Sequence, residues 1–309
     1  MNGSTRPKIP RRLLDGVLLL DKPLGLSSND ALIRAKKIYL AKKAGHTGTL
    51  DPLATGLLPL CFGEATKFSQ DLLEADKTYE STMRLGVRTT TGDAEGEALQ
   101  TRDVTCDEAA IHAAMARFRG EIAQVPPMYS ALKRDGKPLY EYARAGQTVE
   151  REARNVTIHA LDLIACALPD VTFRVTCSKG TYVRTLAEDI GEMLGCGAHL
   201  VALRRTGVGA LTLEHAVTLD ALAEASPAER DGWLQPVDAL LSTFPAVHLD
   251  ADATRRFQQG QRLKLSDIEN APAEADRVRV YSRDDQRLLG VARAGEGVLA
   301  PERLVVSVA

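Results

Sequence analysis

Residues 45–67 read GHTGTLDPLATGLLPLCFGEATK, a loop rich in Gly and Thr that leads into an apolar, strand-like segment. In this loop Asp51 stands directly before Pro52, and a lone Asp-Pro is more often a turn or a cap than a catalyst. The stretch fits neither the phosphate-binding GxxxxGK[ST] loop nor the GxGxxG dinucleotide turn, and the chain holds no GxSxG motif. The stretch therefore offers one carboxylate for chemistry and no motif for binding a nucleotide.

The segment before this loop predicts a short buried strand and then a basic helix. Residues 16–21 (GVLLLD) are apolar and are followed by turn residues. Ser28, Asn29 and Asp30 offer N-caps for a helix that we expect to run to about Lys43. Its basic residues, with no acid among them, fit either a solvated helix face or a surface that contacts phosphates. They are Arg34, Lys36, Lys37, Lys42 and Lys43.

Strand and helix patterns alternate irregularly after the loop. Strand-like segments extend to about Arg88, and Thr105 with Glu108 forms a capping box for a helix to about Phe118. Residues 171–177 place apolar side chains at every second position, as a half-buried strand does. This mixture favours an α+β body over a doubly wound sheet.

A further helix, a connector and then a change to short strand-like runs mark the end of this body. Apolar residues recur at helical spacing from Val183 to Leu194, and residues 226–245 have the Pro and Ala content of a connector. From about Val247 onward, the short runs VRVY, LLGVAR and RLVVSV are separated by turns. They predict a small all-β terminal domain of about 60 residues.

Length and composition indicate a globular protein of two domains. The chain has 309 residues, against roughly 150 for a typical domain. A hydrophobic content of 44% and a charged content of 26% exclude a largely disordered chain. The formal net charge of −2 excludes a uniformly basic coat but allows a segregated basic face. No apolar run reaches the ~18 residues of a membrane span, and the basic start lacks a signal-peptide pattern, so we expect a cytoplasmic protein.

Cysteine and histidine usage gives no sign of a metal site. The five cysteines are widely spaced without a CxxC pair, and the six histidines form no HxxxH or HExxH group. Such spacing is not typical of a disulfide framework or of a zinc site.

Residues 45–67 resemble the signature of the bacterial tRNA pseudouridine synthases of the B type, the TruB family, which isomerise uridine 55 in the TΨC loop of tRNA. Five more segments resemble family blocks in family order, namely LLLDKPLGLSS, DKTYE, QVPPMYSALK, CSKGTYVRTLAEDIG and LRRTGVG. The ending GVLAPERLVV is similar to the family's PUA-like module. The resemblance implies an α+β, mixed-sheet catalytic body with a small C-terminal all-β PUA-like domain. The expected divisions are a basic extension (1–13), the catalytic domain (14–246) and the PUA-like RNA-binding domain (247–309).

The reaction of this family explains why one carboxylate can suffice. Pseudouridine formation breaks the C1′–N1 bond, turns the uracil and joins C1′ to C5. Substrate and product are isomers, so the resemblance implies neither a cofactor nor a metal. It assigns the carboxylate to Asp51. Whether Asp51 attacks C1′, adds to C6 or takes a proton from the ribose stays open at this point.

The resemblance also implies a partner for this carboxylate. Burial raises the pKa of a carboxyl group and a neighbouring Arg lowers it, so the two effects must nearly cancel to keep Asp51 ionised at neutral pH. Arg184, in the GTYVRT part of its block, is the implied partner and could hold both carboxylate oxygens. The alternative is a helix-surface pair between Arg184 and Glu188, four residues on.

Further substrate-binding residues follow from the resemblance alone. Tyr79 and Tyr182 match family tyrosines that contact the flipped base, and Tyr79 would stack on it and take part in moving the C5 proton. Leu203 matches a pocket residue that contacts the base, and His46 matches the histidine that fills the gap left by this base. Lys67 is either structural or phosphate-facing. Without the resemblance, both tyrosines would be interpreted as core residues.

Three functions compete on these observations. The first is a monomeric RNA isomerase that acts on the T-arm stem-loop of tRNA, without a membrane or a protein partner. The second is an RNA-binding or chaperone module that keeps the fold without the chemistry, and Asp51, Tyr79 and Arg184 argue against it. The third is a pseudouridine synthase for ribosomal RNA, which the block QVPPMYSALK disfavours.

Overall fold

One mixed sheet forms the body of the molecule in the computed structural model, which describes residues 10–306. Its main strands lie in the order β1-β3-β12-β4-β11-β10-β7, with β2 beside β3 and β13 beside β12. Their bounds are β1 (Gly16–Lys22), β2 (Ala44–His46), β3 (Ala54–Phe62), β4 (Lys77–Leu85), β7 (Gly120–Gln124), β10 (Arg154–Ala167), β11 (Asp170–Cys177), β12 (Ala198–Val208) and β13 (Leu211–Thr212).

The pairing of β12 with β3 brings two distant parts of the chain together. It is parallel over Leu203 to Arg205 on β12, whereas the other strand pairs of this sheet are antiparallel. Gly56 on β3 has φ +99°, and a Cβ there would lie 2.2 Å from the Arg205 carbonyl oxygen. Glycine is therefore needed for this close approach, which places the loop before β3 next to β12.

Helices and 3-10 turns cover both faces of β1 and β3. Leu18 and Leu58 face a core shared with α1 (Ser28–Ile38), whereas Val17 and Leu57 face a second core. Burial on both faces explains why β1 reads as a continuous apolar run in the sequence. The other helices of the body are α2 (Ser69–Leu73), α3 (Glu108–Ala116), α4 (Leu139–Arg144), α5 (Val183–Met193), α6 (Leu219–Glu224) and α7 (Pro227–Gly232). Its 3-10 turns are η1 (Gly63–Phe68), η2 (Leu213–His215) and η3 (Val237–Leu241).

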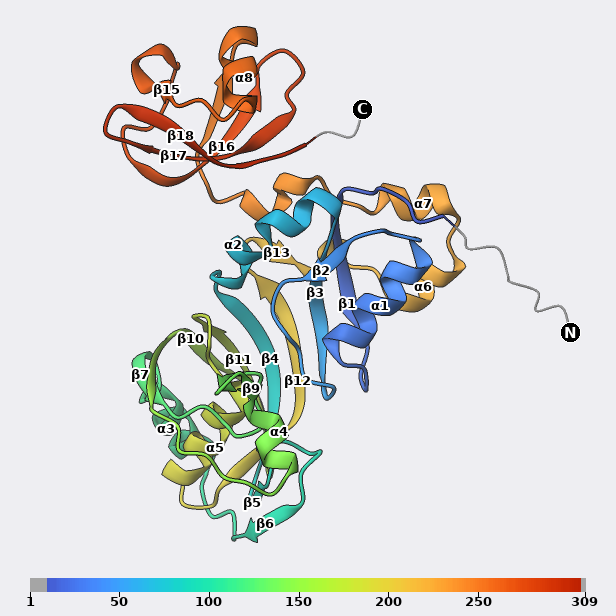
Figure 1. Ribbon diagram of the computed structural model, residues 1–309. Helices are drawn as coiled ribbons and strands as arrows, with labels where there is room; N and C mark the ends of the chain where they lie inside the picture. Colours follow the sequence, from blue (N-terminus) through green and yellow to red (C-terminus); the bar gives the residue numbers. More distant parts are fainter. Residues whose placement is uncertain (1–9, 307–309) are drawn as a thin grey trace, which may run out of the picture.

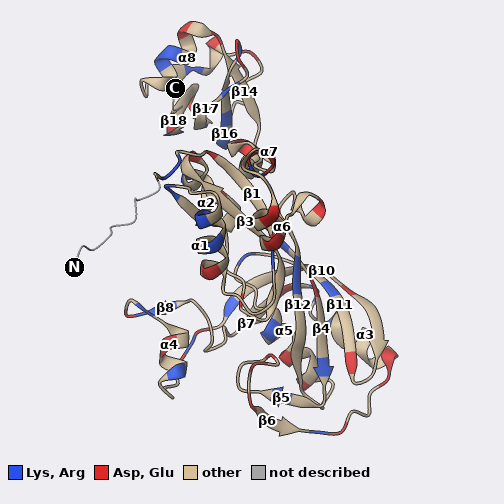
Figure 2. Cartoon of the chain, turned by 90° about the vertical axis from the view of Figure 1, so that its right-hand side faces the viewer, with Lys and Arg blue, Asp and Glu red and all other residues tan. Residues whose placement is uncertain are grey.

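Two short hairpins project from the body. The first joins β5 (Val87–Thr89) to β6 (Ala98–Thr101), and the second joins β8 (Lys133–Arg134) to β9 (Lys137–Pro138). Figure 2 shows β8 and the following helix α4 standing away from the sheet.

A small β domain sits at the end of the body opposite the β5–β6 hairpin, next to α2 (Figure 1). Its five-stranded sheet has the order β14-β16-β17-β18-β15, and the helix α8 (Ala251–Gln258) packs beside it through the buried Phe257. The strands are β14 (Ala246–Leu249), β15 (Leu263–Lys264), β16 (Ala275–Ser282), β17 (Leu288–Gly295) and β18 (Val298–Leu304), with the 3-10 turn η4 (Leu265–Asp267). The expected fold class, an α+β mixed-sheet body with a small C-terminal β domain, is confirmed.

The seam between the body and this domain is both apolar and charged. Val291 of β17 belongs to the same buried cluster as Leu240 and Leu241 of the body. Arg277 Nη2 lies 3.0 Å from Asp71 Oδ1, so β16 is tied to α2. The terminal domain is therefore packed on the body through a shared core.

Some expected boundaries are wrong for local reasons. The first helix ends at Ile38 rather than near Lys43, because the buried Tyr39 follows and Leu40 adopts φ +54°. Its N-cap side chain is Ser27.

Four other segments differ from the sequence prediction. The N-cap of α3 is Asp107, so Thr105 and Glu108 form no capping box. Between β3 and β4 the chain forms η1 and α2 rather than strands, and residues 226–245 contain α7 and η3 rather than a plain connector. β18 ends at Leu304, so Val305 and Val306 of the run RLVVSV lie beyond it, and the last two residues of this run lie outside the described residues. Within residues 10–306, no helix is long and apolar enough to cross a membrane.

Candidate active site

A pocket of about 260 Å³ opens where β4, β12 and the start of α5 meet the loop between β2 and β3. This volume is slightly below the ~300–1,000 Å³ that is typical of small-molecule sites. Asp51, Tyr79, Tyr182, Arg184 and Leu203, all expected from the sequence, line the pocket together. The other lining residues are Gly48, Thr49, Leu50, Leu73, Lys77, Ser130, Ala131, Ser178, Gly180, Thr181, Val183 and Arg205.

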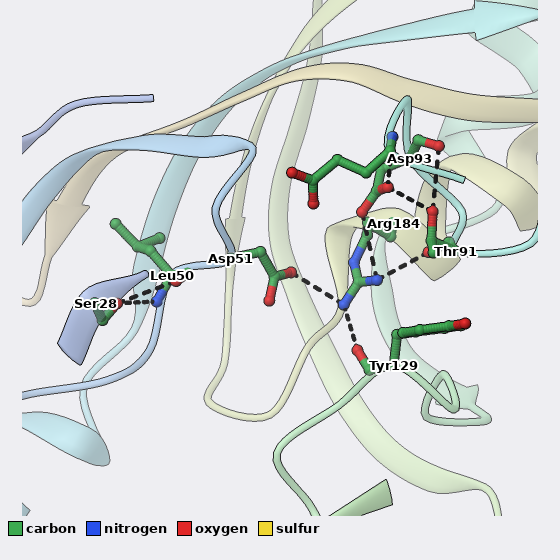
Figure 3. Close-up of polar contacts among 8 residues, drawn as sticks. Ser28, Leu50, Asp51, Thr91, Asp93, Tyr129 and Arg184 are labelled. Atoms are coloured by element: carbon green, nitrogen blue, oxygen red, sulfur yellow. Dashed lines mark hydrogen bonds and ion pairs between the residues drawn. The ribbon is translucent and has the colours of Figure 1, made fainter. Parts of the chain in front are cut away.

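The loop that carries Asp51 is held in place by backbone hydrogen bonds. The Leu50 N–H donates to Ser28 Oγ at 2.7 Å, and the Ser28 hydroxyl bonds the Leu50 carbonyl at 3.1 Å (Figure 3). The Gly25 N–H donates to the Pro52 carbonyl at 2.8 Å. The first turn of α1 and the turn after β1 thus fix the loop on both sides of Asp51.

Arg184 meets this carboxylate from the first turn of α5. Its Nη2 lies 3.0 Å from Asp51 Oδ2, and its Nη1 lies 3.5 Å from Asp93 Oδ2. The guanidinium also donates to the carbonyls of Thr91, at 2.8 Å, and Tyr129, at 2.7 Å (Figure 3). Because Arg184 is only 5% exposed, these contacts fix its orientation.

The alternative surface pair with Glu188 is not formed. In the described part of the chain, the ion-pair partners of Arg184 are Asp51 and Asp93. Glu188 instead lies beside Gly92, where a Cβ would be 3.1 Å from the Glu188 carboxyl carbon. Burial raises the pKa of Glu188 to about 7.

Burial affects the pKa of Asp51 more than the attraction of the neighbouring cations does. Desolvation raises its pKa and is the largest effect; Arg184 and then Lys22 lower it, while the nearby Asp93 raises it. The pKa therefore lies above the ordinary value, although 41% of the side-chain surface still faces the pocket. The expectation that burial and the Arg184 charge would nearly cancel is thus only partly met.

The two tyrosines and Leu203 come from three different elements. Tyr79 lies on β4, and Leu203 on the neighbouring β12 is 9% exposed. Tyr182 is the N-cap residue of α5, and its backbone exchanges two hydrogen bonds with the Gln124 side chain, at 2.8 and 3.1 Å. Both tyrosines therefore line the pocket, and Tyr79 also packs against the main core.

His46 and Lys67 lie apart from this group. His46 pairs with Leu60 across β2 and β3 and is not among the described residues that line the pocket. Burial, and then the Arg205 charge, lowers its pKa. Lys67 Nζ lies 2.6 Å from Glu64 Oε2 and donates to the Leu304 carbonyl at 3.0 Å, so it sits at the seam with the terminal domain.

Sequence reasoning missed three charged residues at the site. Asp93 lies on a loop 91 residues before Arg184 and belongs to no recognised block, so nothing in the sequence signals its part in the ion pair. Lys77 and Arg205 stand within the blocks DKTYE and LRRTGVG, which is the signal that could have found them. Lys77 is buried, which lowers its pKa to about 8, and its Nζ donates to the Leu73 carbonyl at 2.6 Å.

The charges of the site do not form a metal centre. Residues 10–306 contain no group of three or more His, Cys, Asp or Glu side chains placed to hold a metal ion. Basic residues also lie on α1 and on α8 (Figure 2).

Comparison with known proteins shows which family this chain matches. Residues 36–183 match the TruB family pseudouridylate synthase N-terminal domain, residues 184–242 the tRNA pseudouridylate synthase B C-terminal domain, and residues 245–305 the pseudouridine synthase II TruB C-terminal domain. The chain is 80% identical to the tRNA pseudouridine synthase B of Burkholderia mallei, over 98% of both chains. It is 68% identical to the protein of the same name from Cupriavidus metallidurans, again over 98% of both chains.

Solved structures share the fold at lower identity. A chain in the crystal structure of a Cbf5-Nop10-Gar1 complex has a TM-score of 0.75 and 28% identity, and the similarity covers 94% of this chain and 85% of that one. A chain in an H/ACA RNP bound to a substrate RNA containing 2′-deoxyuridine has a TM-score of 0.74 and 25% identity, covering 96% and 86%.

Proposed function

Because this chain belongs to the TruB family of pseudouridylate synthases, we propose that it converts uridine 55 in the TΨC loop of tRNA to pseudouridine. One observation carries this proposal: the Asp51 carboxylate faces a pocket of nucleoside size and is held 3.0 Å from the buried Arg184. Relatives that are 80% identical bear the name tRNA pseudouridine synthase B, which supports tRNA as the substrate.

The proposed reaction is an isomerisation. The C1′–N1 bond breaks, the uracil turns, C5 bonds to C1′, and the proton lost from C5 is balanced by one gained at N1. Atoms and charge balance without a cofactor. Asp51 is the group that starts the reaction, by attack on C1′, by addition to C6 or by removal of a ribose proton. All three need an ionised carboxylate, which the Arg184 contact favours.

The other pocket residues bind the base in this proposal. Tyr79 and Tyr182 offer ring faces on which a flipped uracil can stack, and Leu203 contacts its edge. Tyr79 also takes part in moving the C5 proton. His46, outside the pocket, fills the space that the flipped base leaves in the RNA.

In this proposal one domain carries out the reaction and the other increases the affinity for RNA. We assign residues 14–246 to catalysis and residues 247–309 to a PUA-like RNA-binding domain, with residues 1–13 as an extension, of which the structure describes only 10–13. On α8, Arg255 is exposed and Arg256 is half-buried, and both could meet phosphates outside the T loop. In this proposal the protein acts as a monomer in the cytoplasm, without a membrane or a protein partner.

The test uses an unmodified T-arm stem-loop and maps pseudouridine at single-nucleotide resolution. Wild-type protein should convert position 55 and leave the other uridines unchanged. Two matched controls are the same RNA with cytidine at position 55 and the Asp51→Asn protein. If the RNA binds but contains no pseudouridine, the protein is an RNA-binding module and the proposal fails. Conversion of ribosomal RNA fragments in preference to the T arm would favour a different substrate.

A further inference from the structure

Gln124, the last residue of β7, carries a buried side-chain amide beside the pocket. It is 2% exposed and opens the block QVPPMYSALK. Within residues 10–306, both of its side-chain hydrogen bonds go to the backbone of one residue, Tyr182. The Tyr182 N–H donates to Gln124 Oε1 at 2.8 Å, and Gln124 Nε2 donates to the Tyr182 carbonyl at 3.1 Å. The end of β7 is therefore joined to the start of α5 by a two-point contact.

The pattern of these two hydrogen bonds requires an amide at position 124. A backbone N–H can donate but not accept, and a backbone carbonyl can accept but not donate. Their partner must therefore present an acceptor and a donor side by side, as a Gln side chain does. An ionised Glu has acceptors alone, and Met offers at most a weak acceptor. Because a buried amide without partners is costly, the backbone of Tyr182 explains why a polar residue stands at this buried position.

The contact fixes the beginning of α5. Tyr182 is the N-cap residue of this helix, and within the described part of the chain no side chain caps the first turn in the usual way. The loop before it turns at Gly180, which has φ +79°. Helix ends fray unless they are held, and Arg184 is the second residue of α5. The backbone position of Tyr182 therefore decides where the Arg184 side chain starts.

The chain that follows Gln124 returns to this arginine. Five residues on, the Tyr129 carbonyl accepts a hydrogen bond from Arg184 Nη2 at 2.7 Å (Figure 3). The same nitrogen lies 3.0 Å from Asp51 Oδ2. The short segment 124–129 thus holds the start of α5 at two points, the Tyr182 backbone and the Arg184 guanidinium.

We propose that Gln124 is a positioning residue for the reaction, which holds the first turn of α5 so that Arg184 meets the Asp51 carboxylate. Gln124 is not among the described residues that line the pocket, so it acts through Tyr182 and Arg184 rather than on the RNA. This inference rests on the proposed pseudouridine synthase function.

The test compares Gln124→Met, which removes both hydrogen bonds, with Gln124→Glu, which keeps an acceptor but loses the donor. The matched control is Asn155→Ala, which removes an exposed side-chain amide from the same pair of strands, where it bonds Glu121 at 2.7 Å. Single-turnover rate at saturating T-arm stem-loop, affinity for this RNA and thermal midpoint are measured for each, with rates normalised to the folded fraction.

We expect both Gln124 variants to lose more than about tenfold in rate, because a misplacement of ~1 Å at a catalytic group can cost about 100-fold. Their affinity should stay within about threefold, since an indirect effect on geometry acts on the rate. The control should keep the wild-type rate. If either Gln124 variant turns over normally once folded, or if the loss is confined to affinity or to the thermal midpoint, the inference is wrong.

A double-mutant cycle with Arg184→Lys tests whether the effect passes through the arginine. In the Arg184→Lys background, Gln124→Met should cost no more than about twofold further, because the two changes remove the same alignment. If the two losses multiply instead, Gln124 acts independently of Arg184 and the inference is wrong.

The pH profile gives a second readout that a purely structural role would not move. Among the charges that act on Asp51, Arg184 and Lys22 lower its pKa and Asp93 raises it. Loss of the Arg184 alignment in Gln124→Met should therefore move the acidic limb of the rate to higher pH. An unchanged limb would overturn the inference. If wild-type protein makes no pseudouridine, the proposed function itself fails, which is a distinct result.

Discussion

The pocket and the terminal domain use basic residues in opposite ways. Arg184 and Arg205 are nearly inaccessible to solvent, and each donates to two backbone carbonyls. Arg255 on α8 pairs with Asp252, but 71% of its side chain is exposed. Buried cations orient a few atoms and are weakly screened, whereas exposed cations act through long-range, salt-sensitive attraction. Changes in the pocket should therefore alter rate, and changes in the terminal domain should alter affinity.

The strongest test of this division is Asp51→Asn. The amide keeps the size of the side chain but removes the nucleophile and base, so the rate should fall by about 100-fold or more. Affinity for tRNA should stay nearly intact. Single-turnover kinetics and equilibrium binding give the two values, and Asp21→Asn, at a carboxylate paired outside the pocket, is the control. Turnover above a few per cent of wild type would show that Asp51 is not the essential carboxylate.

Arg184→Lys should be the next most severe change. Lys keeps the charge but ends in a single nitrogen, which cannot meet Asp51, Asp93 and two backbone carbonyls from a rigid fork. We expect a loss of more than tenfold in single-turnover rate, equivalent to ~1.4 kcal/mol. Arg88→Lys, in a surface pair with Glu192, is the matched control. A near-normal rate would place the role of Arg184 outside the chemical step.

The pH profile should follow the raised pKa of Asp51. The ionised carboxylate is the active form, so the rate should fall as the pH drops through this pKa, by about tenfold per unit below it. Asp93 raises the pKa of Asp51, so Asp93→Asn should move this acidic limb to lower pH. Single-turnover rates at saturating RNA across mildly acidic to neutral pH, with circular dichroism to confirm folding, give both profiles. If the acidic limb of Asp93→Asn moved to higher pH instead, the charge of Asp93 would not raise the pKa of Asp51.

In the terminal domain, exposed charges should change affinity alone. Deletion is a poor test because Val291 completes a buried cluster of the body. Replacing Arg256, Arg262 and Lys264 by Gln should instead weaken binding of full-length tRNA by about tenfold. The salt dependence should become flatter by about 2 to 3 units if each residue neutralises one phosphate. The single-turnover rate at saturating RNA should not change, and an unchanged salt slope would remove these residues from the RNA interface.

The smallest effect is expected at the seam. Lys67→Met removes the ion pair with Glu64 and the hydrogen bond to the Leu304 carbonyl. It should lower the free energy of unfolding by about 1 kcal/mol and leave tRNA affinity and rate unchanged. Thermal and urea melts measure the first quantity. A selective loss of affinity would instead support the phosphate-facing alternative for Lys67.

The sequence predicted elements whose pattern is local. The apolar spacing from Val183 to Leu194 gave α5, and the alternation in residues 171–177 gave β11. The end of α1 was wrong because it depends on Tyr39, which packs against Phe62, a residue distant in the chain. Helix boundaries of this kind are decided by tertiary contacts rather than by propensity.

At the site, the sequence identified the residues that lie in recognisable blocks and missed what only the fold brings together. Asp51 and Arg184 were expected as a pair through the resemblance, and the structure places them 3.0 Å apart. Asp93 carries no such signal, because a lone Asp in a loop is usually exposed. Arg205 stands in the block LRRTGVG, but an Arg in a strand is usually exposed, so its burial was not expected. Their burial follows from the packing of α5 and β12.

The position of β12 has a consequence for how the protein is made. This strand lies in the middle of the sheet, between β3 and β4, yet residues 198–208 follow both neighbours in the chain by more than 100 residues. During synthesis, β1 with β3 and β4 with β11 can each pair first, but a gap stays open between them until β12 leaves the ribosome. Late, non-local pairing of this kind slows folding and leaves strand edges exposed in the meantime. Because Leu203 and Arg205 are supplied by β12, the nascent chain acquires its pocket only when this last central strand closes the sheet.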